Sequence, residues 1–256
     1  MENNKSGTNQ KLWVFGDSFT GMQYQDESWM WLLYKSFVGN RLYISSKGSR
    51  DVQTIIDIFL RNLKDIKPDD FVILMLPTLS RFRLPIKNPT MDCEFHSEFK
   101  LGHEKMYHLD YFTGNGYYVC TADDFDENIL EEPISFIHYK EFDLTAPDKK
   151  PSTGSIISMI NSSNANLTNT NEILKSFVKY FPFKLAIYSW VNELDDSIVM
   201  TKSKIESDIG FWHTLRDVWN ETNGEEGRMS DIHWSKKMDK AFFEYVAKTY
   251  PEYFKN

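Results

Sequence analysis

The sequence predicts an α/β fold with a mostly parallel sheet, and three features of its N-terminal part indicate this. The apolar run Leu12–Phe15 ends in Gly16, as a central strand does where it reaches the edge of a sheet. Strand and helix patterns then alternate as β-α-β-α-β, which is the order of an α/β protein. The third strand, Phe71–Leu76, is apolar throughout, which is typical of a strand covered by helices on both faces.

The elements between these strands have clear local signals. Apolar residues recur at helical spacing over Trp29–Phe37, and the pair Gly39-Asn40 is expected to cap that helix at its C-terminal end. Arg41–Ser45 alternates between polar and apolar residues and predicts a second strand. Asp51 is a favoured N-cap residue for an amphipathic helix that we expect over Val52–Ile66.

The regular alternation stops after the third strand. No clean helix–strand pattern is found over about 84–171, and the last part, Ser152–Asn171, is a polar segment rich in Ser, Asn and Thr. Because a structureless loop of this length would be unusual in a compact domain, we expect an insertion with some structure that ends in a polar linker. Since it follows the third strand, it would lie at the ligand-binding edge, as a lid or as a surface for a protein partner.

The core pattern resumes after the insertion. The expected elements are a helix near Glu172–Phe181, a strand over Phe183–Trp190, a helix over Asp208–Thr222 and a last helix over Lys236–Tyr250. Ser235 is a suitable N-cap for the last helix. We therefore expect one domain over residues 11–256, preceded by a disordered polar tail over residues 1–10.

Composition argues against several classes of function. The net charge is -8 and the basic residues are scattered, so a general nucleic-acid surface is not expected. The longest apolar stretch, Phe71–Pro77, is too short to span a bilayer, and no basic segment precedes an apolar one as in a secretory signal. We expect a soluble, cytoplasmic protein that binds neither nucleic acid nor membranes.

The two cysteines and the nearby histidines do not predict a metal centre. Cys93, His96, His103, His108 and Cys120 share one stretch of the chain, but they do not form the two tight pairs of a structural zinc site. Free thiols in a reducing compartment and scattered surface histidines fit this pattern better. We therefore expect no metal and no cofactor.

Two tripeptides from opposite ends of the chain carry the chemical signal. Gly16-Asp17-Ser18 follows the first strand, where Ser18 is expected to stand past the carboxyl end at which α/β sheets bind ligands. Asp231-Ile232-His233 precedes the last helix. Each also has a structural interpretation. The first fits a β-turn with Ser18 as a helix N-cap, and His233 fits a loop histidine held by local hydrogen bonds.

Together the tripeptides resemble the first and last sequence blocks of the SGNH (GDSL-type) serine hydrolases. The resemblance covers about 11–83 and 172–250 and implies a three-layer α/β/α sandwich with a flavodoxin-like sheet. It implies that Ser18 is the nucleophile, that His233 is the general base and then the general acid, and that Asp231 orients the imidazole. The usual spacing is Asp-x-x-His, whereas this chain has the Asp-x-His of some acetyltransferase-like members, with Ser230 at the usual Asp position.

The resemblance also implies an oxyanion hole, which this chain matches only in part. The backbone N–H groups of Ser18 and of Gly48, after the second strand, would bind the oxyanion, although Gly48 equally fits a plain strand-to-helix turn. After the third strand the family usually has Gly-x-Asn-Asp, and here Pro77 to Arg81 contains no Asn. The hydroxyl of Thr78 and the positive charge of Arg81 or Arg83 are candidates to replace a donor that contributes about 10²–10³ in rate.

These residues predict an esterase or deacetylase of O-acyl esters. Small-molecule esters and acylated carbohydrates are the expected substrates, the latter from the resemblance and from the aromatic content of 15%. The alternative is a catalytically weak or inactive binding or structural module that keeps the fold and uses the insertion as a docking surface. The missing Asn and the shifted Asp favour this alternative, whereas the presence of Ser18 and His233 opposes it.

Overall fold

The computed structural model describes residues 9–20, 27–46, 50–79, 164–222 and 232–255. It also gives the secondary structure, without side chains, of residues 82–85, 94–101, 104–111 and 117–120. The predicted disordered tail falls almost entirely outside these residues.

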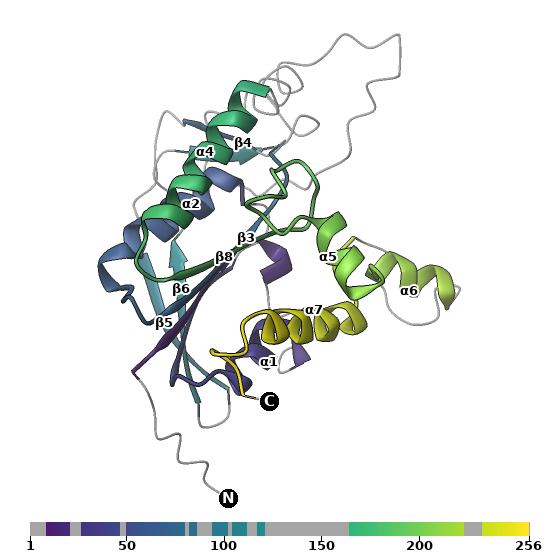
Figure 1. The fold of residues 1–256 in the computed structure, drawn as a ribbon, viewed down its shortest axis with the longest axis horizontal. Coiled ribbons are helices and arrows are strands. Elements are labelled where there is room, and N and C mark those ends of the chain that lie inside the picture. The colour runs from purple at the N-terminus through teal and green to yellow at the C-terminus, as the bar shows by residue number, and fades with distance from the viewer. Residues whose placement is uncertain are drawn as a thin grey trace, which may run out of the picture.

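The centre of the fold is a parallel sheet of four strands in the order β2-β1-β3-β8 (Figure 1). They comprise Lys11–Gly16 (β1), Arg41–Ser46 (β2), Phe71–Leu76 (β3) and Lys184–Ser189 (β8). All four strands were predicted, and their ends differ from the predicted ones by at most one residue. The first strand lies in the interior with the second and third on either side, as in flavodoxin-like sheets.

Helices cover both faces of this sheet and give the predicted three-layer α/β/α sandwich (Figure 1). One layer contains α1 (Trp29–Ser36) and α7 (Lys236–Thr249), and the other contains α2 (Val52–Asn62) and α4 (Asn164–Tyr180). Within β1, Leu12 and Val14 join the first core while Trp13 and Phe15 join the second. Because successive side chains of a strand point to opposite faces, a strand between two helical layers must be apolar at every position.

Asp51 caps α2 as predicted. Its carboxylate accepts a hydrogen bond from the Thr54 N–H at 2.7 Å, which satisfies one of the free donors at the start of the helix. The regular helix ends earlier than predicted, at Asn62, and the expected last turn, Leu63–Asp65 (η3), is a 3-10 turn.

The end of α1 differs from the prediction that Gly39-Asn40 would cap it. The C-cap is Phe37, which has extended backbone angles, and among the described glycines only Gly210 has a positive φ. A Cβ atom on Gly39 would collide with the backbone oxygen of Gln10 and with the ring of Phe37. Gly39 is therefore needed because two chain segments approach closely, and not because a helix ends there.

The insertion adds strands to the sheet that the sequence did not predict. Its hairpin of β5 (Glu94–Leu101) and β6 (Glu104–Tyr111) is antiparallel, and β6 pairs in parallel with β2, so the hairpin extends that edge. A separate antiparallel pair is formed by β4 (Phe82–Pro85) and β7 (Tyr117–Cys120). The four central strands lie outside the insertion.

Helix α4 begins inside the segment that was expected to be a polar linker. It starts at Asn164 instead of near Glu172, and Leu167, Leu174 and Phe177 pack in the second core at helical spacing. The many Asn and Thr residues on its other positions conceal this apolar stripe in the sequence.

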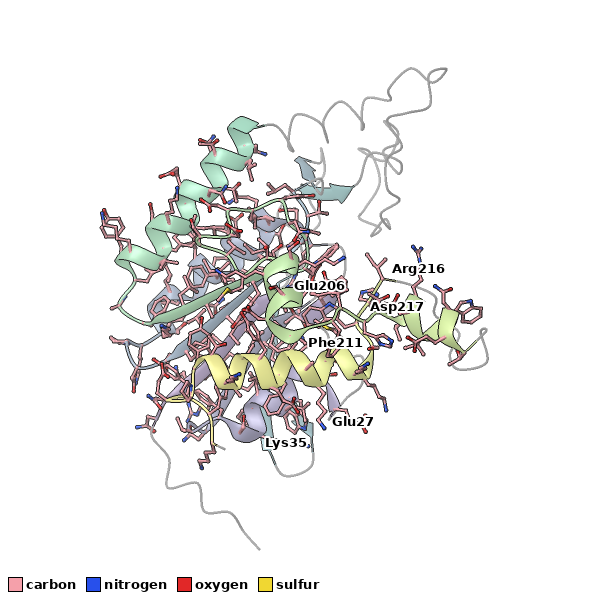
Figure 2. The ribbon with its side chains drawn as sticks, turned by 45° about the vertical axis from the view of Figure 1, so that its right-hand side comes forward. Glu27, Lys35, Glu206, Phe211, Arg216 and Asp217 are labelled. Atoms are coloured by element: carbon pink, nitrogen blue, oxygen red, sulfur yellow. The ribbon has the colours of Figure 1, made fainter. Side chains whose placement is uncertain are left out.

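The single helix predicted over Asp208–Thr222 is wrong, because this region contains two helices. Helix α5 (Lys202–Ile209) ends at Gly210, which has a left-handed φ of 86°. Helix α6 (Leu215–Glu221) begins with a capping box between Thr214 and Asp217. Figure 2 shows Arg216 and Asp217 on α6, which projects away from the sheet. No helix in the described part of the chain is long and apolar enough to cross a membrane.

Candidate functional site

Ser18 lies in the turn that follows β1. Residues Ser18–Thr20 form a 3-10 turn (η1), and the Thr20 N–H donates to the carbonyl of Asp17 at 3.0 Å. A Cβ atom on Gly16 would collide with the side chain of Thr20, so the strand can turn this sharply only with glycine there. The turn leaves Ser18 half-buried at the carboxyl end of the interior strand, between two buried neighbours.

Asp17 fixes this turn from within. It is fully buried, and its carboxylate accepts hydrogen bonds from the Phe19 N–H at 3.0 Å and from Nε1–H of Trp190 at 3.1 Å. The first bond is the one expected of a helix cap, so Asp17, not Ser18, caps the turn. The second joins the loop after β1 to the loop after β8. The structural interpretation of Ser18 as an N-cap is therefore wrong.

Arg50, which stands shortly before α2, is bonded to the start of the same turn. Its side chain is 1% exposed, and Nη1 donates to the Gly16 carbonyl at 3.3 Å and to Oγ of Ser45 at 2.9 Å. Burying a guanidinium is costly unless it is bonded, and these two bonds attach Arg50 to the ends of β1 and β2. The sequence analysis did not select Arg50 because its contacts are made across two strands.

The loop after β3 is held by an acidic residue that the sequence analysis also missed. Glu193 accepts hydrogen bonds from the Thr78 hydroxyl and from the Leu79 N–H, both at 2.5 Å. A hydroxyl can donate one hydrogen bond, and Thr78 donates it to Glu193. Thr78 would therefore serve as the predicted oxyanion donor only if its bond to Glu193 broke.

His233 reaches this edge of the sheet from the other end of the chain. Its half-buried imidazole stacks on the ring of Phe19, with centroids 4.9 Å apart and planes inclined by 30°. Because Phe19 directly follows Ser18, this stack places His233 against the turn that carries Ser18. The β-turn and loop-histidine interpretations of these residues do not predict this contact.

The loop that carries His233 is anchored by several bonds. The Leu215 N–H donates to the His233 carbonyl at 2.7 Å, and Thr214 forms an antiparallel bridge with Trp234. Ser235 caps α7 as predicted, because its Oγ accepts the Met238 N–H at 3.2 Å. These bonds fix the position of His233 between α6 and α7.

A second histidine, His213, contacts the same segment before α7. His213 Nδ1 lies 2.7 Å from Ser235 Oγ, and its Nε2 lies 3.2 Å from Glu221. The order Ser235–His213–Glu221 resembles a catalytic triad, but Ser235 is buried and its hydroxyl is engaged as a helix cap. We therefore assign this group a structural role.

The structure describes three of the predicted site residues, namely Ser18, Thr78 and His233. Asp231, Gly48 and Arg81 lie outside the described residues, as do the side chains of the Cys93 to Cys120 stretch. In the described part of the chain, no group of three His, Cys, Asp or Glu side chains is arranged to hold a metal ion.

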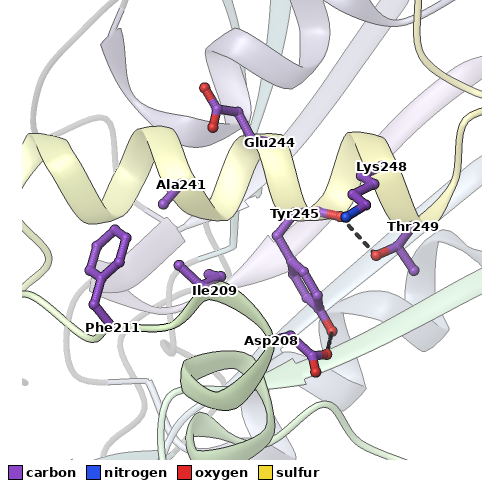
Figure 3. Close-up of a pocket in the computed structure, with 8 residues that line it drawn as sticks. All are labelled: Asp208, Ile209, Phe211, Ala241, Glu244, Tyr245, Lys248 and Thr249. Atoms are coloured by element: carbon purple, nitrogen blue, oxygen red, sulfur yellow. Dashed lines mark hydrogen bonds between the residues drawn. The ribbon is translucent and has the colours of Figure 1, made fainter.

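A groove of about 560 Å³ between α5 and α7 lies apart from this edge (Figure 3). Tyr245 and Asp208 meet across it through a hydrogen bond of 2.9 Å. Its lining residues come from α5, the segment after it and the middle and C-terminal part of α7, whereas His233 precedes the N-terminus of α7. None of the described site residues, Ser18, Thr78 and His233, lines it.

Comparison of the chain with protein-family models, with curated proteins and with solved structures finds no match. The case for a function therefore depends on the residues and their geometry.

Proposed function

We propose that this protein is a serine hydrolase of the SGNH type that cleaves small O-acyl esters, as an esterase or deacetylase. The observation that carries the proposal is the stacking of His233 on Phe19, beside Ser18, at the carboxyl edge of the sheet. A serine hydroxyl is a poor nucleophile until a base removes its proton, so a serine turn and a histidine that meet at a ligand-binding edge favour nucleophilic catalysis.

The proposed reaction gives each residue of the triad one role. Ser18 Oγ attacks the acyl carbonyl while His233 takes its proton, and His233 then gives that proton to the departing alcohol. Water, activated by the same imidazole, releases the acyl group from Ser18 in the second half of the reaction. Asp231 holds the imidazole in the required tautomer and stabilises its charged form.

The oxyanion would be bound by the backbone N–H groups of Ser18 and Gly48. The bond from Thr78 to Glu193 leaves no hydroxyl proton for a third donor in the described loop after β3. Since one donor contributes about 10²–10³ in rate, we expect slow turnover compared with a hydrolase that has all three. No cofactor takes part in the proposed reaction.

The test is turnover of a panel of acetylated sugars and simple aryl acetates. Wild-type protein should release acetate, and Ser18→Ala should abolish the release while its melting temperature stays close to that of the wild type. Ser176→Ala is the matched control, because this exposed hydroxyl on α4 bonds to the Glu172 carbonyl of its own helix. A wild-type protein that hydrolyses none of these esters, or a Ser18→Ala variant that remains fully active, would favour the binding-module alternative.

A further inference from the structure

Phe19 is the residue at which the loops of the candidate site converge. Its ring is buried and stacks on Trp190, with centroids 4.4 Å apart and planes inclined by 17°. The same ring stacks on His233 and meets Trp234 edge to face at 5.6 Å. It therefore contacts aromatic residues from the loop after β8 and from the loop before α7.

The partners of Phe19 and its own backbone are fixed by hydrogen bonds. Asp17 accepts from the Phe19 N–H and from the indole N–H of Trp190, so one buried carboxylate sets both members of that stacked pair. The Phe19 carbonyl accepts from the indole N–H of Trp29, the first residue of α1, at 2.9 Å. With both backbone groups bonded and the ring packed between neighbours, Phe19 offers a rigid flat surface.

We propose that Phe19 is a positioning residue that sets the orientation of the His233 imidazole relative to Ser18. A histidine side chain can rotate about two bonds, and stacking on a fixed ring restricts both rotations. Because Ser18 and Phe19 are consecutive, the turn that places the nucleophile also places the surface against which the base lies. The effect of Phe19 on catalysis rests on the proposed hydrolase function, whereas its effect on the orientation of His233 does not.

The catalytic test compares Phe19→Leu with Phe37→Leu. Both changes keep an apolar side chain of similar size and remove an aromatic ring from the same core, but Phe37 lies at the far end of α1 against Phe254. We expect both variants to lose thermal stability. We expect only Phe19→Leu to lose about 10- to 100-fold in kcat for an acetyl ester, with KM nearly unchanged, because small misplacements of a catalytic group are costly.

A second measurement tests the proposal without any activity. Stacking on Phe19 should shift the ring protons of His233 upfield in the NMR spectrum of the wild-type protein, and this shift should disappear in Phe19→Leu and persist in Phe37→Leu. Should Phe19→Leu fail to fold, Phe19→Met takes its place, because Met adapts to irregular space in a core.

The two measurements separate this inference from the proposed function. Upfield His233 signals in a wild-type protein that hydrolyses no ester would support the stacking while refuting the hydrolase. Ordinary His233 signals in the wild-type protein, or equal kcat values for the two leucine variants, would overturn the positioning role of Phe19.

Discussion

Asp239 is expected to make the folded protein less stable as the pH rises from about 4 to about 8. It lies in the first turn of α7, is 4% exposed, and accepts a hydrogen bond from the backbone N–H of Trp29 at the start of α1. Burial raises the pKa of this carboxyl from its ordinary value of 3.8 to about 8, and the bond from Trp29 opposes that shift. In the same turn of α7, Lys236 forms an exposed ion pair with Glu27 at 2.8 Å (Figure 2 labels Glu27).

The sign follows from which state holds the proton. Between the two pKa values the folded protein keeps a proton on Asp239 that the unfolded chain has lost, so unfolding releases a proton and becomes more favourable as the pH rises. The free energy of unfolding should therefore fall by about 1.4 kcal/mol for each pH unit in this window, or ~4 kcal/mol between pH 4 and pH 7. Above the folded pKa no further loss is expected from this group.

The perturbation is Asp239→Asn, which keeps an oxygen to accept the Trp29 N–H and carries no charge at any pH. Urea unfolding of the variant and of the wild type at several pH values between 4 and 8 measures the difference. We expect the variant to be more stable at pH 7, by up to ~4 kcal/mol, and of similar stability at pH 4. Asp65→Asn, at an exposed carboxyl, is the control and should leave the free energy of unfolding unchanged at both pH values. Parallel stability curves for wild type and Asp239→Asn would refute the reasoning.

Three further outcomes are expected from the described geometry and the proposed triad. Gly16→Ala should lower the free energy of unfolding by about 1–3 kcal/mol in urea, because its Cβ would collide with Thr20 and stand 3.0 Å from the Cβ of Met75; unchanged stability would contradict this packing. Glu193→Ala should lower the free energy of unfolding by about 1–2 kcal/mol, because Thr78 and the Leu79 N–H lose this acceptor. A variant as stable as the wild type would show that the bonds contribute little. Asp231→Ala should retain more ester turnover than Ser18→Ala, since the orienting carboxylate contributes less than the nucleophile, and equal losses would argue against that role.

Local signals in the sequence were sufficient for the central sheet and for two helix starts. The strand Phe71–Leu76 was predicted residue for residue, and Asp51 and Ser235 cap α2 and α7 through the bonds that their side chains favour. These features depend on neighbours in the chain, so a sequence pattern contains them. The same holds for the break between α5 and α6, where Gly210 and the Thr214–Asp217 capping box were present in the sequence and were overlooked.

What could not be predicted depends on contacts between distant segments. The hairpin β5–β6 joins the sheet only through pairing with β2, and Gly39 is required by the approach of Gln10. In the candidate site, the tripeptides located Ser18 and His233, but the bonds of Asp17 to Trp190 and of Glu193 to Thr78 join residues more than 100 positions apart. A motif identifies residue types with suitable chemistry, whereas only the fold shows which side chains hold them in place.

The central claim is that Ser18 is an activated nucleophile, and covalent labelling with a fluorophosphonate tests it most directly. Only a serine whose proton is taken by a base reacts readily with this reagent. The account predicts one adduct per chain, mapped by mass spectrometry to Ser18 and absent from Ser18→Ala and His233→Ala. A wild-type protein that gains no adduct, or an adduct that persists in either variant, would contradict it.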